Sequence, residues 1–156
     1  MGERTPHLDA LARGGWIGLT ASATRADLIR AVIEGVSYSQ RDCLDLVEAL
    51  GVEVNSVRAS GGGAKSAFWR QLLASILNKR VVTLETQEGS AYGAALLAMV
   101  GSGEFGSVQE ACRAVICETD SVSPDGDAAF YAKAHRVYAG LYGALKPVYA
   151  EIARLT

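Results

Sequence analysis

Apolar residues recur at helical spacing over a long stretch in the first third of the chain. From Leu28 to Leu50 most are three, four or seven residues apart with charged residues between them, which predicts an amphipathic helix. Thr24 followed by Asp27 is a variant of the capping box and predicts that the helix begins there. Gly51 predicts its C-terminal end.

Three short segments have the pattern of strands. Residues 14–19 are apolar and bracketed by glycines, residues 52–60 alternate between apolar and polar, and residues 80–84 are rich in β-branched side chains. A run of three glycines ends the second segment, and helical spacing resumes over residues 68–77.

The second half of the chain predicts further helices. Residues 89–100 are mostly small, which predicts a helix whose backbone lies close to its neighbours, and Gly35 in the first helix suggests similar close packing. Residues 108–115 predict a shorter helix, residues 121–126 a turn, and residues 130–152 a long helix with one apolar stripe.

Strands and helices therefore alternate, which is typical of an α/β fold with largely parallel strands. Only about three strands are visible, fewer than the usual five or six of a sheet. We expect the remaining strands to lie upstream of this chain. No repeat or linker divides the 156 residues, which predicts one globular domain.

Composition and charge exclude several classes of function. The 15 basic and 17 acidic residues give a net charge of −2, and no basic stripe predicts binding to nucleic acid. No apolar run predicts a signal peptide or a membrane span, so we expect a cytoplasmic protein. The three cysteines match neither a disulfide framework nor a zinc site.

The turn at residues 60–66, Ser-Gly-Gly-Gly-Ala-Lys-Ser, is the strongest candidate for a binding site in the sequence. Glycine lets the backbone approach a ligand, and the start of the following helix attracts anions. The turn matches neither the P-loop nor the dinucleotide fingerprint. A purely structural turn is the alternative. Lys65 is either a phosphate ligand or a solvated lysine, and Trp69 either covers an adenine face or belongs to the core.

Longer motifs resemble the FGGY family of carbohydrate kinases. The second signature of that family is matched from Gly14 to Glu34, and the glycine turn together with residues 69–71 is similar to its adenosine motif. Residues 88–95 resemble the small-residue helix that follows. Residues 2–7 and 12–14 resemble the segment before the signature in members of the family that act on xylulose. The matches run in family order over essentially the whole chain.

This resemblance implies an actin-like ATPase architecture of two ribonuclease-H-like domains. Residues 1–156 would form the later part of the second domain, and ATP and Mg²⁺ would be the cofactors. Gly62 would approach the nucleotide phosphates, Gly61 and Gly63 would shape the turn, and Ser66 would face the adenosine. The resemblance places the catalytic base and the metal-binding phosphate loop in the first domain, so no catalytic or metal residue is assigned here.

The resemblance implies that the parent transfers the γ-phosphoryl group of ATP to a sugar, and that this chain alone is inactive. Xylulose is the expected sugar. Ala23 stands where many family members that act on xylulose have histidine, so gluconate, glycerol and ribulose remain alternatives. A non-catalytic nucleotide-binding module or an interaction domain is a further alternative. We also expect a homodimer formed through the strand at residues 16–19, because an incomplete sheet leaves an open edge.

Overall fold

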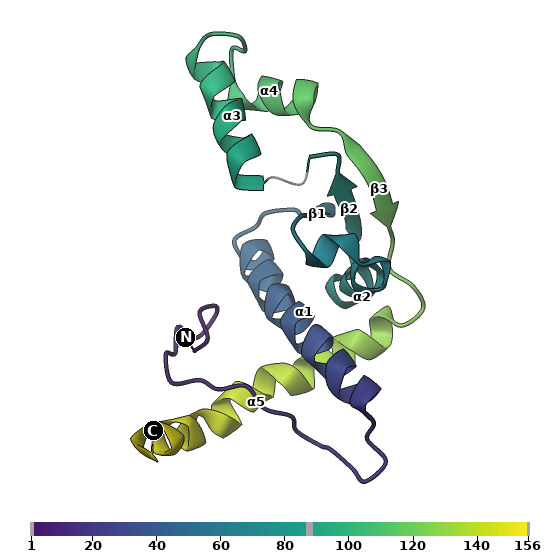
Figure 1. Cartoon of the computed structure of the whole chain (residues 1–156), viewed down its shortest axis with the longest axis vertical. Coiled ribbons are helices and arrows are strands. Elements are labelled where there is room, and N and C mark those ends of the chain that lie inside the picture. Colours follow the sequence, from purple (N-terminus) through teal and green to yellow (C-terminus); the bar gives the residue numbers. More distant parts are fainter. Residues whose placement is uncertain (1, 87–88, 156) are drawn as a thin grey trace.

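The computed structural model describes residues 2–86 and 89–155. Its elements follow one another as five helices, three strands and one turn of 3-10 helix (Figure 1). They are α1 (Arg25–Ala49), β1 (Ser56–Ala59), η1 (Gly63–Lys65), α2 (Ala67–Leu77), β2 (Arg80–Leu84), α3 (Gly89–Gly101), α4 (Val108–Val115), β3 (Glu118–Val122) and α5 (Ala128–Leu155).

The first long helix forms where the sequence predicts it. Thr24 caps α1, and the reciprocal hydrogen bonds of a capping box join it to Asp27. The hydroxyl and the amide of Thr24 both donate to the Asp27 carboxylate, which lowers the pKa of that carboxyl. Gly51 adopts a φ of +82° just beyond the helix, a conformation that favours glycine.

The sheet has three strands in the order β1-β2-β3. The β1 and β2 strands are parallel, with Val57 opposite Val81, whereas β3 is antiparallel to β2. The sequence missed β3, and the prediction of a largely parallel sheet holds only for the first pair. Among the described strands β1 pairs only with β2, so its other edge is open.

The strand predicted at residues 14–19 does not form. These residues have no regular structure, and the side chains of Trp16, Ile17 and Leu19 are more than half exposed. The indole of Trp16 donates to the carbonyl of Leu28 at 3.2 Å, which holds the segment beside the start of α1. Glycine-bracketed apolar residues alone do not make a strand, because a strand needs a ladder partner.

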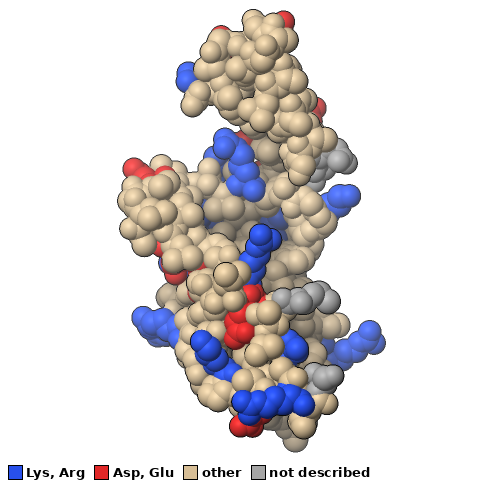
Figure 2. Space-filling view, turned by 90° about the vertical axis from the view of Figure 1, so that its left-hand side faces the viewer, with Lys and Arg blue, Asp and Glu red and all other residues tan. Residues whose placement is uncertain are grey.

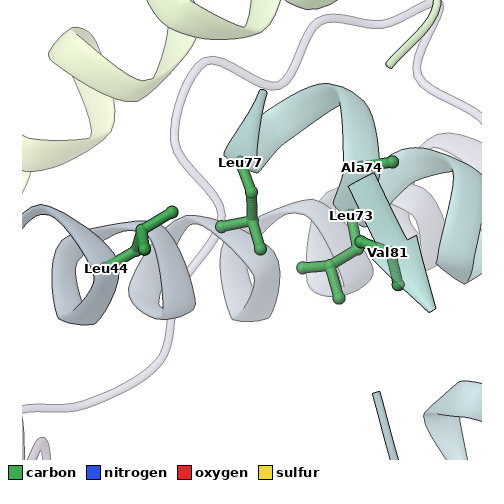
Figure 3. Packing of buried hydrophobic residues seen from close by; sticks show 5 residues of the cluster. All are labelled: Leu44, Leu73, Ala74, Leu77 and Val81. Atoms are coloured by element: carbon green, nitrogen blue, oxygen red, sulfur yellow. The ribbon is translucent and has the colours of Figure 1, made fainter. Parts of the chain in front are cut away.

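Helix α2 is the centre of the hydrophobic core. One face of α2 packs with α1 and the sheet in a cluster of Leu44, Leu73, Ala74, Leu77 and Val81 (Figure 3). Another face meets α1 and α5 in a second cluster that contains Tyr38, Leu72, Ile76 and Tyr131. The core thus joins α1, α2, β2 and α5 around the helix that follows the glycine turn.

Helix α5 crosses α1 and is fastened to it by polar contacts (Figure 1). His135 lies 2.7 Å from Asp42, and Arg30 donates to the hydroxyl of Tyr131 at 2.7 Å. Tyr38 is buried at the same crossing, and its burial, followed by the nearby Glu34 carboxylate, raises its pKa to about 12. These contacts fix the position of α5 relative to α1.

Helices α3 and α4 pack on each other and project away from the α1–α5 crossing (Figure 1). The hydroxyl of Tyr92 donates to the carbonyl of Val115 and joins the two helices. A Cβ atom on Gly93 or on Gly35 would meet nothing within 4 Å. The close backbone packing predicted at both positions is therefore wrong for the described residues.

Charged side chains of both signs are scattered over the surface in Figure 2, and no stripe of one sign crosses that face. None of the helices in the described part of the chain combines the length and the apolar character needed to cross a membrane.

Candidate functional site

The glycine turn lies between the end of β1 and the start of α2. Gly61 has a φ of +82°, which is a left-handed conformation that side chains rarely adopt. The chain then enters the 3-10 turn η1, in which Lys65 donates to the carbonyl of Gly62 and Ser66 to that of Gly63. The sequence prediction of a tight turn between a strand and a helix is confirmed.

Of the three glycines only Gly63 has a close neighbour beside its Cα atom, while Gly61 differs from Gly62 in its backbone conformation. A Cβ atom on Gly62 would meet nothing within 4 Å, so the protein leaves open space beside this residue. A Cβ atom on Gly63 would lie 3.0 Å from two ring carbons of Trp69. Gly63 is therefore required by protein packing and Gly61 by its backbone conformation, whereas no neighbour in the structure explains the absence of a side chain at Gly62.

The backbone amides of the turn can receive an anion. Those of Gly61, Gly62 and Gly63 have no hydrogen-bond partner among the described residues. Gly61 and Gly62 are exposed, and the turn leads directly into the N-terminus of the 11-residue helix α2. Unpaired amides beside the positive end of a helix dipole favour a negatively charged group. Binding of an anion such as a phosphate at this turn stays a prediction.

Ser66 caps α2. Its hydroxyl oxygen accepts a hydrogen bond from the amide of Trp69 at 3.3 Å. A hydroxyl that accepts in this way keeps its own proton for a further partner. Ser66 thus has a structural role, and a contact with a ligand stays a prediction.

The side chains of Trp69 and Arg70 link the turn to α1 and β3 by hydrogen bonds. The indole of Trp69 donates to Ser37, a fully buried residue of α1, at 3.1 Å. Arg70 donates to the carbonyl of Ala64 at 2.7 Å and to Asp120 of β3 at 2.9 Å. Trp69 packs against the core, which favours its structural interpretation over an adenine cover.

Lys65 is exposed and forms no ion pair with the described residues.

The start of α3 lies next to the turn. A Cβ atom on Gly89 would be 3.7 Å from the hydroxyl oxygen of Ser60. The structure therefore brings together the end of β1, the three glycines, the cap of α2 and the first residue of α3. Sequence reasoning identified the glycines and Ser66 but not the Ser37 and Asp120 anchors, because 29 and 54 residues separate them from Ser66.

The described residues hold no site suited to Mg²⁺. No group of three or more His, Cys, Asp or Glu side chains gathers there in a way that could hold a metal ion. Asp120, the carboxylate that bonds to Arg70, also accepts a hydrogen bond from the amide of Ser121. The described residues therefore do not fit the metal on their own.

A hollow of about 270 Å³ lies elsewhere, between the N-terminal segment and α5. The rings of His7 and Tyr142 stack in its wall with centroids 3.6 Å apart, and the hydroxyl of Tyr142 donates to Asp9 at 2.9 Å. The amide of Leu11, and next this hydroxyl, lower the pKa of Asp9. The bond between Tyr142 and Asp9 and the stacking of His7 on Tyr142 are typical of a structural contact.

Comparisons with known proteins point to one family. The family described as "FGGY family of carbohydrate kinases, C-terminal domain" matches residues 1–102. The xylulose kinase of Staphylococcus epidermidis is 40% identical over 156 residues, which cover 99% of this chain and 32% of that protein.

Two solved structures from Lactobacillus acidophilus are also similar. One is described as a ligand-bound xylulose kinase and the other as a gluconate kinase. Each has a TM-score of 0.89 and 32% sequence identity, and each comparison covers 97% of this chain and 31% of the other. The chain therefore spans about a third of the length of these relatives.

Proposed function

Because the chain belongs to the FGGY family of carbohydrate kinases, we propose that it forms the adenosine side of the nucleotide site in an ATP-dependent sugar kinase. The expected α/β fold of an actin-like ATPase domain is confirmed by the likeness to FGGY kinases. The observation that carries the proposal is the run of unpaired amides from Gly61 to Gly63 at the start of α2, where a Cβ atom on Gly62 would meet none of the described residues.

The glycine turn would bind the phosphates of ATP. The free amides of Gly61, Gly62 and Gly63 supply donors, and the missing side chain at Gly62 lets the phosphates approach them. Ser66, with one proton left on its hydroxyl, would face the adenosine.

In the parent enzyme the γ-phosphoryl group would pass from ATP to a sugar hydroxyl, with ADP as the leaving group. The base that takes the hydroxyl proton, and the groups that hold Mg²⁺, would come from the rest of the kinase, since no metal cluster gathers among the described residues. The contribution of this chain is binding and orientation of the nucleotide. On its own it would not turn over.

Xylulose is the proposed sugar, since relatives named xylulose kinase are 40% identical over nearly the whole chain. Gluconate is a second candidate, because the structure described as a gluconate kinase matches equally well. Glycerol and ribulose are weaker alternatives. A cytoplasmic location is proposed because ATP is the phosphoryl donor.

We further propose that the chain forms a homodimer. The predicted interface included a strand at residues 16–19, which does not form, but the side chains of Trp16, Ile17 and Leu19 are exposed. Exposed apolar surface of this kind favours association with a second copy.

A chimaeric kinase tests the proposed function. The part of the Staphylococcus epidermidis enzyme that precedes the matching segment is joined to this chain, and ADP release is measured with xylulose, gluconate, glycerol and ribulose. We expect the highest kcat/KM with xylulose, and no release by the isolated chain. A chimaera that unfolds cooperatively and binds xylulose, but releases no ADP with any sugar, would contradict the proposal. Turnover by the isolated chain would contradict the assigned division of roles.

A further inference from the structure

We infer that Arg70 is a positioning residue that fixes the glycine turn for nucleotide binding, an inference that rests on the proposed function. Arg70 lies in the first turn of α2 and does not border the open space beside Gly62. It acts through the backbone of the turn. The sequence indicates only a polar residue in an otherwise apolar stretch, with a structural hydrogen bond.

The guanidinium of Arg70 joins two elements that the chain separates by more than 50 residues. One nitrogen donates to the carbonyl of Ala64, at the centre of η1, at 2.7 Å. The other donates to a carboxylate oxygen of Asp120 in β3 at 2.9 Å. The second oxygen of Asp120 accepts from the amide of Ser121, so the carboxylate is itself held in place.

The Arg70 end of this link is more buried than the arginines of the other ion pairs of β3. The side chain of Arg70 is 16% exposed, whereas those of Arg58 and Arg80, which pair with Glu118, are 57% and 47% exposed. Asp120 itself is 55% exposed, so the bond of Arg70 to the buried Ala64 is the stronger part of the link. Exposed pairs contribute little, because solvent screens them and both side chains lose freedom. A less exposed, charge-assisted bond to a backbone carbonyl is stronger and more directional.

The hydrogen bond from Arg70 to the Ala64 carbonyl restricts the backbone of the turn. Ala64 is buried, and its carbonyl shares a peptide group with the amide of Lys65, which donates to the carbonyl of Gly62. Fixing this peptide group therefore also restricts the peptide group between Gly62 and Gly63. The amides of Gly61, Gly62 and Gly63 have no hydrogen-bond partner of their own among the described residues. Without the anchor they would sample more orientations, and a ligand would have to order them on binding.

Lysine is the informative replacement. An Arg70→Lys variant keeps the positive charge but loses the planar fork that serves the carbonyl and the carboxylate together. Arg80→Lys is the matched control, because it alters an ion pair to the same strand that does not touch the turn. Asp120→Asn is a second test variant, which leaves Arg70 and its bond to Ala64 in place.

Two measurements on the 156-residue chain test the inference. The first is the ¹⁵N order parameters of Gly61, Gly62, Gly63 and Lys65, which we expect to fall from about 0.85 towards 0.6 in Arg70→Lys. The second is calorimetric titration with ADP, for which we expect Kd to rise about tenfold in Arg70→Lys, two- to threefold in Asp120→Asn and little in Arg80→Lys.

The outcomes separate this inference from the proposed function. If the wild-type chain binds no ADP, its assigned nucleotide role is contradicted, while the order parameters still decide whether Arg70 holds the turn. Unchanged order parameters in Arg70→Lys would overturn the positioning role. Equal losses of ADP affinity in Arg70→Lys and Arg80→Lys would also overturn it.

Discussion

The indole ring of Trp69 lies against Gly63, so closely that a Cβ atom on Gly63 would stand 3.0 Å from two of the ring carbons. The same indole donates to Ser37, which in turn donates to the carbonyl of Ile33 in α1. Helix α1 therefore determines how near the ring comes to the turn. This contact makes Gly63 a structural glycine, in contrast to Gly62 beside it.

The contact predicts opposite results for two neighbouring alanine variants. Gly63→Ala should lower the free energy of unfolding by about 1–2 kcal/mol, because the new methyl group meets the indole. Gly62→Ala, at φ −60° and ψ −40°, should change it by less than about 1 kcal/mol or stabilise the chain. Urea unfolding of both variants measures the difference.

A double-mutant cycle with Trp69→Leu supplies the control for this prediction. The smaller side chain should relieve most of the cost of Gly63→Ala. An equal cost in both backgrounds would show that the indole is not the cause.

A second prediction concerns stability in acid. The hydroxyl of Ser75 donates to Asp125 at 2.7 Å, and this bond, followed by that from the amide of Asp127, lowers the pKa of the Asp125 carboxyl. A carboxyl whose pKa is lower in the folded than in the unfolded state adds stability above the unfolded pKa. That stability is lost as the pH falls through the folded pKa.

Asp125→Asn should therefore flatten the loss of stability below about pH 4. The urea midpoint, measured from neutral pH downward, reports the effect. Glu53→Gln is the control, because Glu53 is exposed and lies outside the helices and strands. The prediction fails if both variants follow the wild-type curve.

The sequence predicted those elements whose signals are local. The capping box of Thr24 and Asp27 placed the start of α1, and β-branched residues placed β2. Strand β3 was missed because Glu118–Val122 is mostly polar and becomes a strand only by pairing with β2. The prediction of a strand at residues 14–19 was wrong for the opposite reason, because these residues have apolar side chains but no neighbouring strand to pair with.

The candidate site was predictable in part for the same physical reason. Three glycines between a strand and a helix are visible in the sequence, and so is Ser66 as a helix cap. The supports are not, because Ser37 and Asp120 reach the turn only through tertiary packing. The sequence also does not show that the indole of Trp69 lies beside Gly63, whereas the space beside Gly62 is open.

A third prediction concerns self-association. Ile29, Val32 and Val36 follow one another at helical spacing on α1 and are 52%, 51% and 42% exposed, beside the exposed apolar residues 16–19. We expect the isolated chain to dimerise through this surface, and Val32→Asp should weaken the dimer. Sedimentation over a concentration series measures it, with Leu97→Asp on the projecting helix α3 as the control. A monomer at every concentration would contradict the expectation.

The most direct test of the account is the effect of Gly62→Val on the two substrates of the chimaeric kinase. A Cβ atom at Gly62 would meet nothing within 4 Å among the described residues, so we expect folding and xylulose affinity to change little. ATP affinity should fall at least about tenfold, because the side chain would occupy the approach of the phosphates. Calorimetric titration with ATP and with xylulose gives both values. Unchanged ATP affinity, or an equal loss for both substrates, would contradict the assignment of the glycine turn to the nucleotide.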